Sequence, residues 1–409
     1  MKFNTLLLHG CKDAFDGTGA TLPPIYQNSA FDHESAEVLQ RVFDNRAPGF
    51  AYTRIGNPTV DAFERRIAFL EGGRGAVACA SGVAAISMTL LALLRSGDEI
   101  ISGSALFGGT LDLLDDFAHF DIRARFVEEM SAEAVEAQVT ENTKVIFAEL
   151  IGNPGLNVIN IRELSEVAGR HGVPLVIDST TATPALIRPL EHGADVVVHS
   201  SSKYINGNGS AIGGVIVDGG KFSWDFDRFP VLQKYRKMGK LALTARLRQD
   251  IWRNFGPCMS PQNAWLNCLG LETLGLRMER LCHNARVLAE SLRHNPNIIC
   301  VNYPGLEGSP YKSNIDAQMK NGQGGALLTL RAGSRERAFK LIDGLKFARI
   351  ATNVGDVRTL VIHPESTIYA HSTEEQKRAA GVYDDLIRVS VGLEDTEDLI
   401  ADFAQASAG

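Results

Sequence analysis

Two polar residues follow apolar segments in the middle of the chain, Asp178 after residues 174–177 and Lys203 after residues 194–199 and three serines. Both apolar segments have the length and composition of buried strands. One crossover connects them, and the carboxyl ends of parallel strands meet at one edge of a sheet, where ligands bind. We therefore expect Asp178 and Lys203 to lie close together at such an edge.

A third apolar segment, residues 75–80, runs into Ser81 and then directly into a helix. The free backbone N–H groups at the start of a helix suit a phosphate. A phosphate cradle, a carboxylate and a lysine are what pyridoxal phosphate (PLP) requires. The lysine forms a Schiff base, the carboxylate keeps the ring nitrogen protonated, and backbone amides hold the phosphate. Phe107, which follows another apolar segment, is well placed to stack on the ring.

Each of these residues also has an ordinary explanation. Asp178 alone is typical of a turn at a strand end, and Ser81 alone of many helix starts. Lys203 alone is compatible with a surface lysine, but the strand before it is apolar and the glycines after it predict close backbone approach. The pair Gly207-x-Gly209 precedes a strand and not a helix, so it does not match a dinucleotide-binding fingerprint. The prediction of a PLP site therefore depends on the combination.

The composition narrows the function further. The 409 residues are 44% hydrophobic and 22% charged, with a formal net charge of -7 and no basic run, so nucleic-acid binding is not expected. Small molecules or copies of the chain are the expected partners. No apolar stretch reaches the roughly 20 residues that span a membrane, and the histidines lack metal-ligand spacing. Six cysteines without a C-x-x-C pair suit a reducing compartment, and we expect a cytoplasmic protein with no metal site.

The chain divides into three expected parts. Residues 1–56 show little periodicity and predict an extended arm. Residues 57–250 alternate apolar strands with amphipathic helices, which is typical of a mostly parallel α/β sheet covered on both faces, here with the PLP site. Residues 251–409 predict a smaller α+β domain with a long helix around 264–293. Strands of the sheet are expected near 75–80, 98–102, 122–127, 144–150, 173–178, 194–199 and 213–218.

Two helices of the middle part have marked ends. Asn57, followed by a proline, and Asn160 are typical of helix starts, because a side-chain oxygen can cap the first free N–H groups. Gly72 and Gly172 are typical of helix ends. We expect one helix between Asn57 and Gly72 and another between Asn160 and Gly172.

Together with further motifs, these residues resemble the Cys/Met-metabolism family of PLP enzymes over nearly the whole chain. The resemblance implies the fold of the PLP-dependent transferases related to aspartate aminotransferase (fold type I), with a mostly parallel sheet domain and a smaller C-terminal α+β domain. The motifs are YTRIGNPT (52–59), SGVAA (81–85), FGGT (107–110), NP (153–154), Asp178, HSSSKY (199–204), NVGD (353–356), IHP (362–364) and IRVSVG (387–392).

The resemblance implies roles for the residues at the sheet edge. Lys203 carries the cofactor, Asp178 pairs with the ring nitrogen, and Asn153 hydrogen-bonds the ring hydroxyl. Phe107 stacks on the ring. The residues expected around the phosphate are Ser81, Gly82, Val83, Ser200 and Ser202.

Other roles extend beyond this edge. By the same resemblance, Tyr52 and Arg54 reach across a dimer interface to the phosphate of the neighbouring subunit. The implied assembly is a homo-oligomer with a dimer as its active unit, within a tetramer. Arg388 matches the arginine that binds the substrate carboxylate, for which a planar two-donor guanidinium is suited; its ordinary explanation is a surface arginine on a strand. Glu149 and Asn353 line the same pocket.

One position departs from the family pattern. Members commonly have tyrosine where this chain has Phe107, so ring stacking is kept while a phenol that could help the leaving group depart is lost. Tyr52 is the nearest alternative acid by resemblance, and Lys203 is the expected base for the α-proton.

The reaction that the resemblance implies is a γ-substitution. Sulfide or a thiol replaces the acetyl group of O-acetyl-L-homoserine and gives homocysteine or methionine. Two alternatives within the family are γ-elimination, as by a methionine γ-lyase, and O-succinylhomoserine as the substrate. An alternative from another class is a nucleotide-binding or interaction protein that uses the sheet edge without chemistry.

Overall fold

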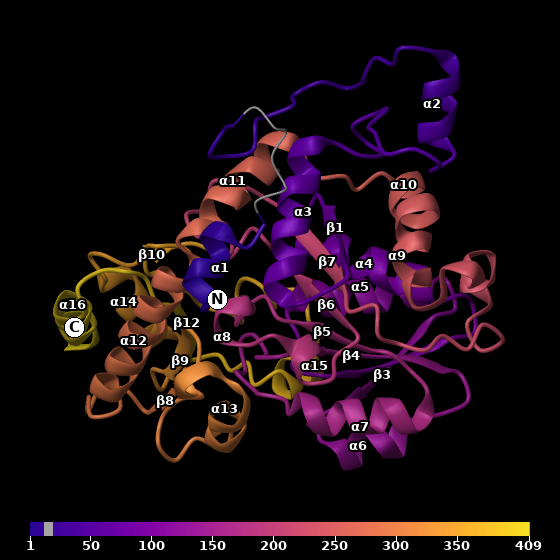
Figure 1. Ribbon diagram of the computed structural model, residues 1–409. Helices are drawn as coiled ribbons and strands as arrows, with labels where there is room; N and C mark the ends of the chain where they lie inside the picture. Colours follow the sequence, from indigo (N-terminus) through magenta and orange to yellow (C-terminus); the bar gives the residue numbers. More distant parts are fainter. Residues whose placement is uncertain (12–18, 409) are drawn as a thin grey trace.

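The computed structural model describes residues 1–11 and 19–408 and contains two β-sheets that lie next to each other (Figure 1). Residues 75–218 form the larger sheet, and the C-terminal part of the chain forms the smaller one. No helix within the described residues is both long and apolar enough to cross a membrane.

The larger sheet consists of β1 (Gly75–Cys79), β2 (Glu99–Gly103), β3 (Arg123–Val127), β4 (Thr143–Glu149), β5 (Leu175–Asp178), β6 (Val196–His199) and β7 (Gly214–Asp218). The order across the sheet is β1-β7-β6-β5-β4-β2-β3. The strands from β6 to β3 run parallel, and β7 runs antiparallel to both β6 and β1. The prediction of a mostly parallel sheet is therefore confirmed.

Helices cover both faces of this sheet (Figure 1). Successive residues of β6 belong to different apolar clusters. Val197 belongs to the cluster with α3 (Pro58–Glu71), and Val198 belongs to the cluster with α4 (Gly82–Leu93). Because successive side chains of a strand point to opposite faces, a continuous apolar run needs a helix layer on each side. The face of α3 also carries α6 (Ala132–Gln138), α7 (Ile161–His171), α8 (Thr183–Leu186) and α11 (Pro261–Glu272), and that of α4 carries α5 (Gly108–Ala118), α9 (Ala242–Arg246) and α10 (Trp252–Phe255).

The ends of α3 and α7 lie where the sequence predicts them. The side chain of Asn57 accepts a hydrogen bond from the N–H of Thr59 at 2.9 Å, and Gly72 ends α3 with φ +74°, in the left-handed region that glycine favours. Asn160 and Gly172 cap α7 in the same way. Both predicted helices are confirmed.

The edge strand β1 is covered by side chains along its free edge. The N–H of Ala78 donates to Oε1 of Glu64 at 2.6 Å, and its carbonyl accepts from Nε1 of Trp252 at 2.9 Å. Arg248 donates to the carbonyl of Ala76 at 2.6 Å. These bonds satisfy main-chain groups that a sheet edge would leave unpaired, and they hold β1 and the turn after it in place.

The smaller sheet consists of β8 (Cys300–Asn302), β9 (Leu327–Arg331), β10 (Arg349–Ile350), β11 (Leu360–Ile362) and β12 (Leu386–Ser390). Its order is β10-β11-β12-β9-β8, which places β12 at the centre. A separate apolar cluster joins the sheet to its helices. These are α12 (Leu274–Leu292), α14 (Arg335–Gly344) and α16 (Thr396–Ala408), with α13 (Lys312–Gln318) and α15 (Glu374–Ala379) in the connections.

The expected long helix over residues 264–293 needs a correction. It is two helices, α11 and α12, which meet at Thr273 with φ -107° and ψ 3°. The residues of α12 up to Cys282 pack into a cluster of the larger sheet, and those from Ala285 pack into that of the smaller sheet. The domain boundary at residue 250 stays a prediction, while the packing changes from one core to the other inside α12.

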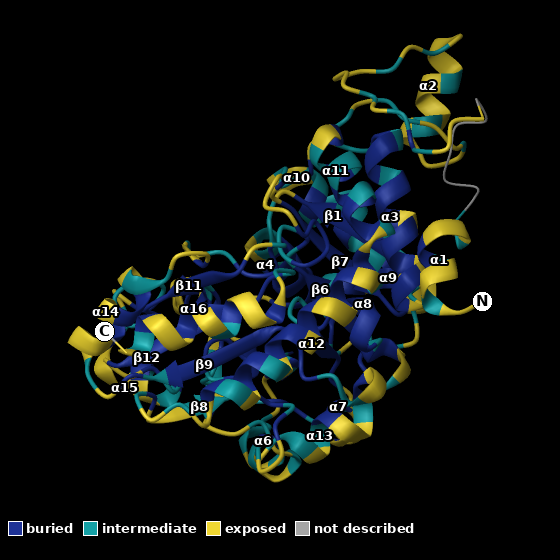
Figure 2. Ribbon diagram, turned by 90° about the vertical axis from the view of Figure 1, so that its left-hand side faces the viewer, coloured by how far each residue is buried: buried dark blue, intermediate teal, exposed yellow. Residues whose placement is uncertain are grey.

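The expectation of a purely extended N-terminal arm also needs correction. The helix α1 (Phe3–His9) packs on its own chain, with Leu7 buried and the Leu7 carbonyl accepting from Arg66 at 3.0 Å. The helix α2 (Ala36–Phe43) has no buried residue and stands apart from both sheets (Figures 1 and 2). Helices of 7 and 8 residues are too short to show a clear period in the sequence.

Candidate active site

A cavity of about 440 Å³ lies where the carboxyl ends of the large-sheet strands face the smaller domain. Strand ends contribute Glu149 and Asp178, and the smaller domain contributes Asn353 and Arg388. Of the predicted site residues, Tyr52 and Arg54 do not line the cavity. Those that line it are Ser81, Gly82, Val83, Phe107, Glu149, Asn153, Asp178, Ser200, Ser202, Lys203, Asn353 and Arg388.

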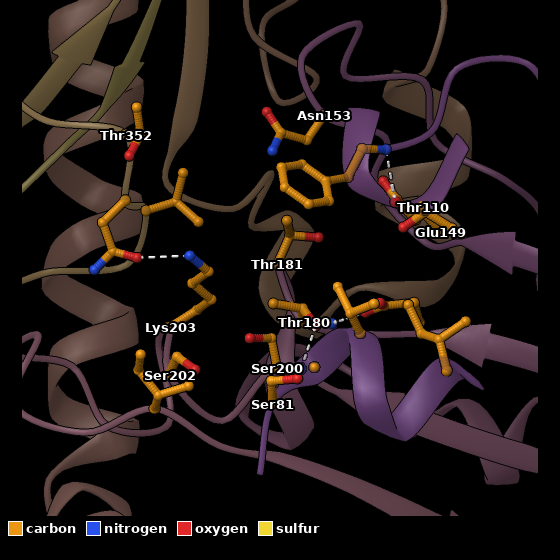
Figure 3. Close-up of a pocket in the computed structure, with 18 of the residues that line it drawn as sticks. Ser81, Thr110, Glu149, Asn153, Thr180, Thr181, Ser200, Ser202, Lys203 and Thr352 are labelled. Carbon is orange, nitrogen blue, oxygen red and sulfur yellow. Dashed lines mark hydrogen bonds between the residues drawn. The ribbon is translucent and has the colours of Figure 1, made fainter. Parts of the chain in front are cut away.

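The two ends of the cavity differ in chemistry. Figure 3 shows Ser81 and Ser200 close together at one end and Asn153 at the other, with Lys203 between the two levels. The first end holds hydroxyl groups and the start of a helix, and the second holds a carboxamide. An elongated ligand with a phosphate at one end therefore matches this arrangement.

The turn that leads into α4 makes the phosphate end. The hydroxyl oxygen of Ser81 accepts from the N–H of Ala84 at 3.1 Å and so caps the helix, while the N–H groups of Gly82 and Val83 have no partner within a helix. Gly82 lies so close to Ser200 that a Cβ added to it would be 2.5 Å from the Cβ of Ser200. Glycine is required here because the main chain of the cradle approaches the next loop closely.

Ser200 and Ser202 reach the same end in different ways. The N–H of Ser200 donates to Oγ1 of Thr180 at 2.8 Å. The hydroxyl of Ser202 accepts from the N–H of Gly213 at 2.9 Å and donates to the Gly213 carbonyl at 3.1 Å. Both serines line the cavity, but the hydroxyl of Ser202 already has two partners in its own chain.

Two buried carboxyl groups stand side by side at the sheet edge. Glu149 and Asp178 are directly paired in the register of β4 and β5. Burial raises the pKa of both, and the neighbouring charge of Asp178 raises the pKa of Glu149 further. The hydroxyl and the N–H of Thr180 donate to Asp178, the latter at 2.8 Å, and favour its charged form. The N–H of Phe107 favours the charged form of Glu149 in the same way, at 2.8 Å, but burial and the charge of Asp178 raise the pKa of Glu149 well above its usual value. Glu149 therefore holds a proton more readily than Asp178.

Lys203 projects into the cavity between these groups. Its Nζ donates to Oδ1 of Asn353 at 2.7 Å, as Figure 3 shows. Burial, and then the positive charge of Arg388, lower the pKa of Lys203 to about 8. This amine can therefore lose its proton far more easily than a surface lysine, as a nucleophile or base must.

Arg388 is a buried cation, 1% exposed, in the central strand β12. Its side chain donates to Oδ1 of Asn153 at 3.2 Å and to the carbonyl of Asn353 at 3.1 Å. No described carboxylate forms an ion pair with it, and its buried Nε has no hydrogen-bond partner among the described residues. Burial lowers its pKa to about 10. A buried guanidinium with unused capacity beside a cavity indicates an anionic ligand.

Several lining residues were not predicted from the sequence. Thr180 contacts both Asp178 and Ser200, and Thr110, Thr181 and Thr352 complete parts of the wall. Thr180 could have been found, because an Asp with a hydroxyl residue two positions later is typical of a turn closed by the Asp side chain.

Tyr52 and Arg54 lie outside the cavity of their own chain. Arg54 donates to the carbonyl of Arg253 at 2.7 Å, and its guanidinium lies 5.5 Å from the centre of the Tyr52 ring. The Tyr52 side chain is 42% exposed. Their expected role at a neighbouring subunit's phosphate stays a prediction.

The donor set of the cavity fits PLP. It offers a helix start with a glycine cradle for the phosphate, the carboxyl group of Asp178, an amine with a lowered pKa, and an arginine whose Nε has no hydrogen-bond partner among the described residues. A family model for "Cys/Met metabolism PLP-dependent enzyme" matches residues 4–408. The chain belongs to this family. The predicted family, cofactor and fold are therefore confirmed, while the roles of single residues remain proposals.

Relatives within this family cover nearly the whole chain. Homocysteine synthase of Schizosaccharomyces pombe is 41% identical and aligns with 99% of this chain and 97% of its own length. O-acetyl-L-homoserine sulfhydrylase of Corynebacterium glutamicum is 40% identical, with 98% and 95% covered. A solved structure described as an O-acetylhomoserine (thiol)-lyase of Campylobacter jejuni has a TM-score of 0.95 and 34% identity over all of both chains, and it contains a pyridoxyl-lysine phosphate.

Proposed function

We propose that this family member uses PLP to replace the acetyl group of O-acetyl-L-homoserine by sulfide or a thiol, giving homocysteine or methionine. The observation that carries the proposal is the shared cavity of Lys203, Asp178 and the buried Arg388. The names of relatives at 40 to 41% identity support this choice of ester.

We propose the cytoplasm as the place of action. Five cysteines, at 79, 258, 268, 282 and 300, form no disulfide within the described structure, which supports this location.

The cofactor would be held along the length of the cavity. We assign its phosphate to the first turn of α4 with Ser81 and Ser200, its ring nitrogen to Asp178, and its ring hydroxyl to Asn153. When bound, PLP supplies an electron sink conjugated with the substrate's Cα. Asp178 can serve the ring nitrogen because it loses its proton more readily than Glu149, and Thr180 favours its charged form against the effect of burial.

Lys203 moves the protons in this proposal. With a pKa of about 8, roughly a tenth of the free amine is neutral at pH 7, against fewer than about one in a thousand for an ordinary lysine. Once the amine of Lys203 is no longer bound to PLP, it takes the proton from the Cα of the substrate and returns it later. Asn353 holds the amine by a 2.7 Å hydrogen bond, which keeps it inside the cavity.

Arg388 binds the substrate carboxylate in this proposal. Its charge also makes the basicity of Lys203 depend on whether substrate is bound. The positive charge of Arg388 helps to lower the pKa of Lys203. A carboxylate bound to Arg388 offsets that charge and so makes Lys203 a stronger base at the moment when substrate is present. An arginine suits this task because its planar donors match both oxygens.

The leaving group explains why Phe107 is compatible with the reaction. Phe107 offers no hydroxyl to protonate a departing group at Cγ, and acetate is a weak base that leaves without a strong acid. From methionine the departing group is a thiolate, which is a much stronger base than acetate and leaves far less readily. The geometry thus favours an ester substrate over methionine, and Tyr52 from a neighbouring subunit remains the proposed acid.

We propose that the active unit is a dimer, within a tetramer, because the phosphate end lacks a cation. The basic residues among the described lining of the cavity are Lys203 and Arg388, which serve other groups. Arg54 of a neighbouring subunit would supply the missing charge. Arg54→Ala and Lys203→Ala, each inactive alone, should complement in mixed dimers and return up to about a quarter of wild-type activity. Verified hybrids with no recovered activity would place Arg54 in its own chain's site.

A paired turnover assay tests the reaction. O-acetylhomoserine and O-succinylhomoserine are each supplied with sulfide, and homocysteine and 2-oxobutanoate are both measured. We expect homocysteine from the acetyl ester at a rate at least tenfold above the succinyl ester. Faster turnover of the succinyl ester would reassign the substrate, and 2-oxobutanoate as the main product with sulfide present would show a lyase.

The covalent assignment has its own test. After borohydride reduction, mass spectrometry should find a pyridoxyl group on Lys203, and Lys203→Ala should bind PLP without a covalent link. A pyridoxyl group on another lysine would refute this role of Lys203. Purified protein that takes up no PLP would exclude the enzyme and leave a binding protein.

A further inference from the structure

The segment that joins β11 to β12, residues 363–385, leaves the smaller domain and enters the core of the larger one. Both strands belong to the small-domain cluster, through Val361 and Ile387 for example. Within the segment, Tyr369, Ala380 and Val382 belong instead to the large-sheet cluster that includes α4 and α5. The segment therefore connects the two domains by packing into the core of the larger one.

Tyr369 is fully buried, and its hydroxyl donates a hydrogen bond to the carbonyl of Leu106. A second contact with the segment lies at Gly108, two residues after Leu106. A Cβ added to Gly108 would be 2.3 Å from the carbonyl oxygen of Ile368, so the two main chains touch. The segment therefore contacts Leu106 and Gly108, the residues on both sides of Phe107.

The larger domain holds Phe107 from another direction. Its N–H donates to Oε1 of Glu149 at 2.8 Å, and its ring packs against Gly109, where an added Cβ would be 2.8 Å from the ring. Phe107 has an apolar ring without a hydrogen bond of its own to orient it. Its orientation must therefore come from the main chain of the turn.

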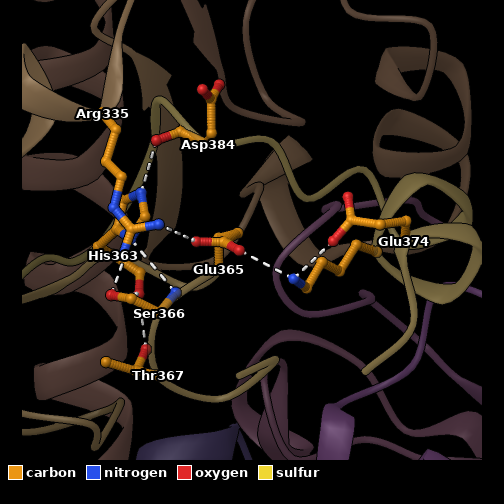
Figure 4. A network of polar contacts seen from close by, with 8 residues as sticks. Arg335, His363, Glu365, Ser366, Thr367, Glu374 and Asp384 are labelled. Carbon is orange, nitrogen blue, oxygen red and sulfur yellow. Dashed lines mark hydrogen bonds and ion pairs between the residues drawn. The ribbon is translucent and has the colours of Figure 1, made fainter. Parts of the chain in front are cut away.

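The 363–385 segment is itself anchored by a polar network (Figure 4). Glu365 accepts from Lys377 at 2.8 Å and from Arg335 at 3.1 Å, which ties the segment to itself and to α14. The ring of His363 contacts the Asp384 carbonyl at 2.7 Å and so closes the two ends of the segment. These contacts fix the position of the segment that carries Tyr369.

We propose that Tyr369 is a positioning residue of the active site, which fixes Phe107 through the carbonyl of Leu106 so that its ring lies against the PLP ring. The inference rests on the stacking of Phe107 under the proposed function. It does not depend on which ester is the substrate. The role belongs to the hydroxyl, because the aromatic ring of Tyr369 only fills the core.

The test uses holoenzyme and measures the rate of PLP release together with the visible circular dichroism of bound PLP. Tyr369→Phe removes the hydroxyl and keeps the ring. We expect roughly tenfold faster release, the range that one buried hydrogen bond supplies, and a weaker dichroic band. Tyr303→Phe is the control: Tyr303 is 2% exposed, and its hydroxyl donates to the Gly325 carbonyl at 3.0 Å and to the Cys282 carbonyl at 3.4 Å. It should change release by less than about twofold.

A double-mutant cycle with Phe107→Leu decides whether Tyr369 acts through Phe107. In that background Tyr369→Phe should change PLP release by less than about twofold, because no ring remains to be positioned. Gly108→Ala, which pushes the turn away from Ile368 without removing the hydroxyl, should resemble Tyr369→Phe in release and dichroism. Wild-type release in Tyr369→Phe, or an equal acceleration in both backgrounds, overturns the proposal. Neither readout requires turnover, so these outcomes leave the proposed reaction untouched.

Discussion

Replacing Lys203 by methionine should stabilise the protein prepared without PLP, and the gain should depend on pH. In the folded chain, burial and Arg388 lower the pKa of Lys203 from its ordinary value of 10.5 to about 8. Below pH 8 the amine is protonated in both the folded and the unfolded chain, so the folded state bears the full cost of a buried charge. As pH rises from 8 to 10.5 the folded chain loses this proton first, and the cost disappears.

The size of the effect follows from these two pKa values. At about 1.4 kcal/mol for each pH unit, the difference between 10.5 and about 8 corresponds to about 3 kcal/mol at pH 7 and about 1 kcal/mol at pH 10. Methionine also leaves Oδ1 of Asn353 without its donor, which costs about 1 kcal/mol at every pH. We therefore expect Lys203→Met to raise the free energy of unfolding by about 2 kcal/mol at pH 7 and to leave it nearly unchanged at pH 10.

Urea unfolding of the PLP-free proteins at pH 7 and pH 10 measures both values. The exposed Lys237, replaced by methionine, controls for the loss of a lysine as such. A gain for Lys203→Met that is the same at both pH values would show a packing effect and refute the argument from charge. A loss of stability at pH 7 would show that Lys203 has an anionic partner in the unliganded fold.

Two further predictions concern the cofactor. Asp178→Asn should keep the fold but slow the reaction by several orders of magnitude, because an amide cannot hold the proton on the ring nitrogen; exchange of the substrate α-proton in D₂O, followed by NMR, measures this, and a near wild-type rate would exclude Asp178 as the ring partner. Gly82→Ala places a Cβ 2.5 Å from that of Ser200 and should weaken PLP binding at least roughly tenfold, or about 1.4 kcal/mol. Gly169→Ala, in α7 with no neighbour within 4 Å of the added Cβ, is its control and should leave PLP affinity unchanged in an equilibrium titration.

The part of the site that follows from sequence alone is the part carried by strand ends. Asp178 and Lys203 end or follow neighbouring parallel strands, and the rule that such ends meet at one sheet edge brings them to one cavity. The Ser81 turn follows from the same rule and from the helix after it. These residues could be predicted because their positions depend on local periodicity and one topological rule.

Residues from the smaller domain could not be predicted in this way. Asn353 lies 150 positions from Lys203, and Arg388 lies 235 positions from Asn153, yet both pairs are hydrogen-bonded. No local pattern fixes how two domains face each other, so only the resemblance pointed to Asn353 and Arg388. The bond between Tyr369 and Leu106, 263 positions apart, has no signal in the sequence at all.

The charges of the cavity are the physical reason for which we propose an assembly larger than one chain. In our proposal Asp178 is the charged member of the buried carboxyl pair, Glu149 holds its proton, and Arg388 is reserved for the substrate carboxylate. A bound phosphate adds up to two negative charges at the Ser81 end, where the described chain offers a helix start equivalent to only about half a positive charge. A dianion in a partly buried site requires more compensation than that. The closest match to this need is a cation brought by another subunit, and Arg54 lies on a segment whose own chain gives its guanidinium only a main-chain carbonyl and the Tyr52 ring as described partners.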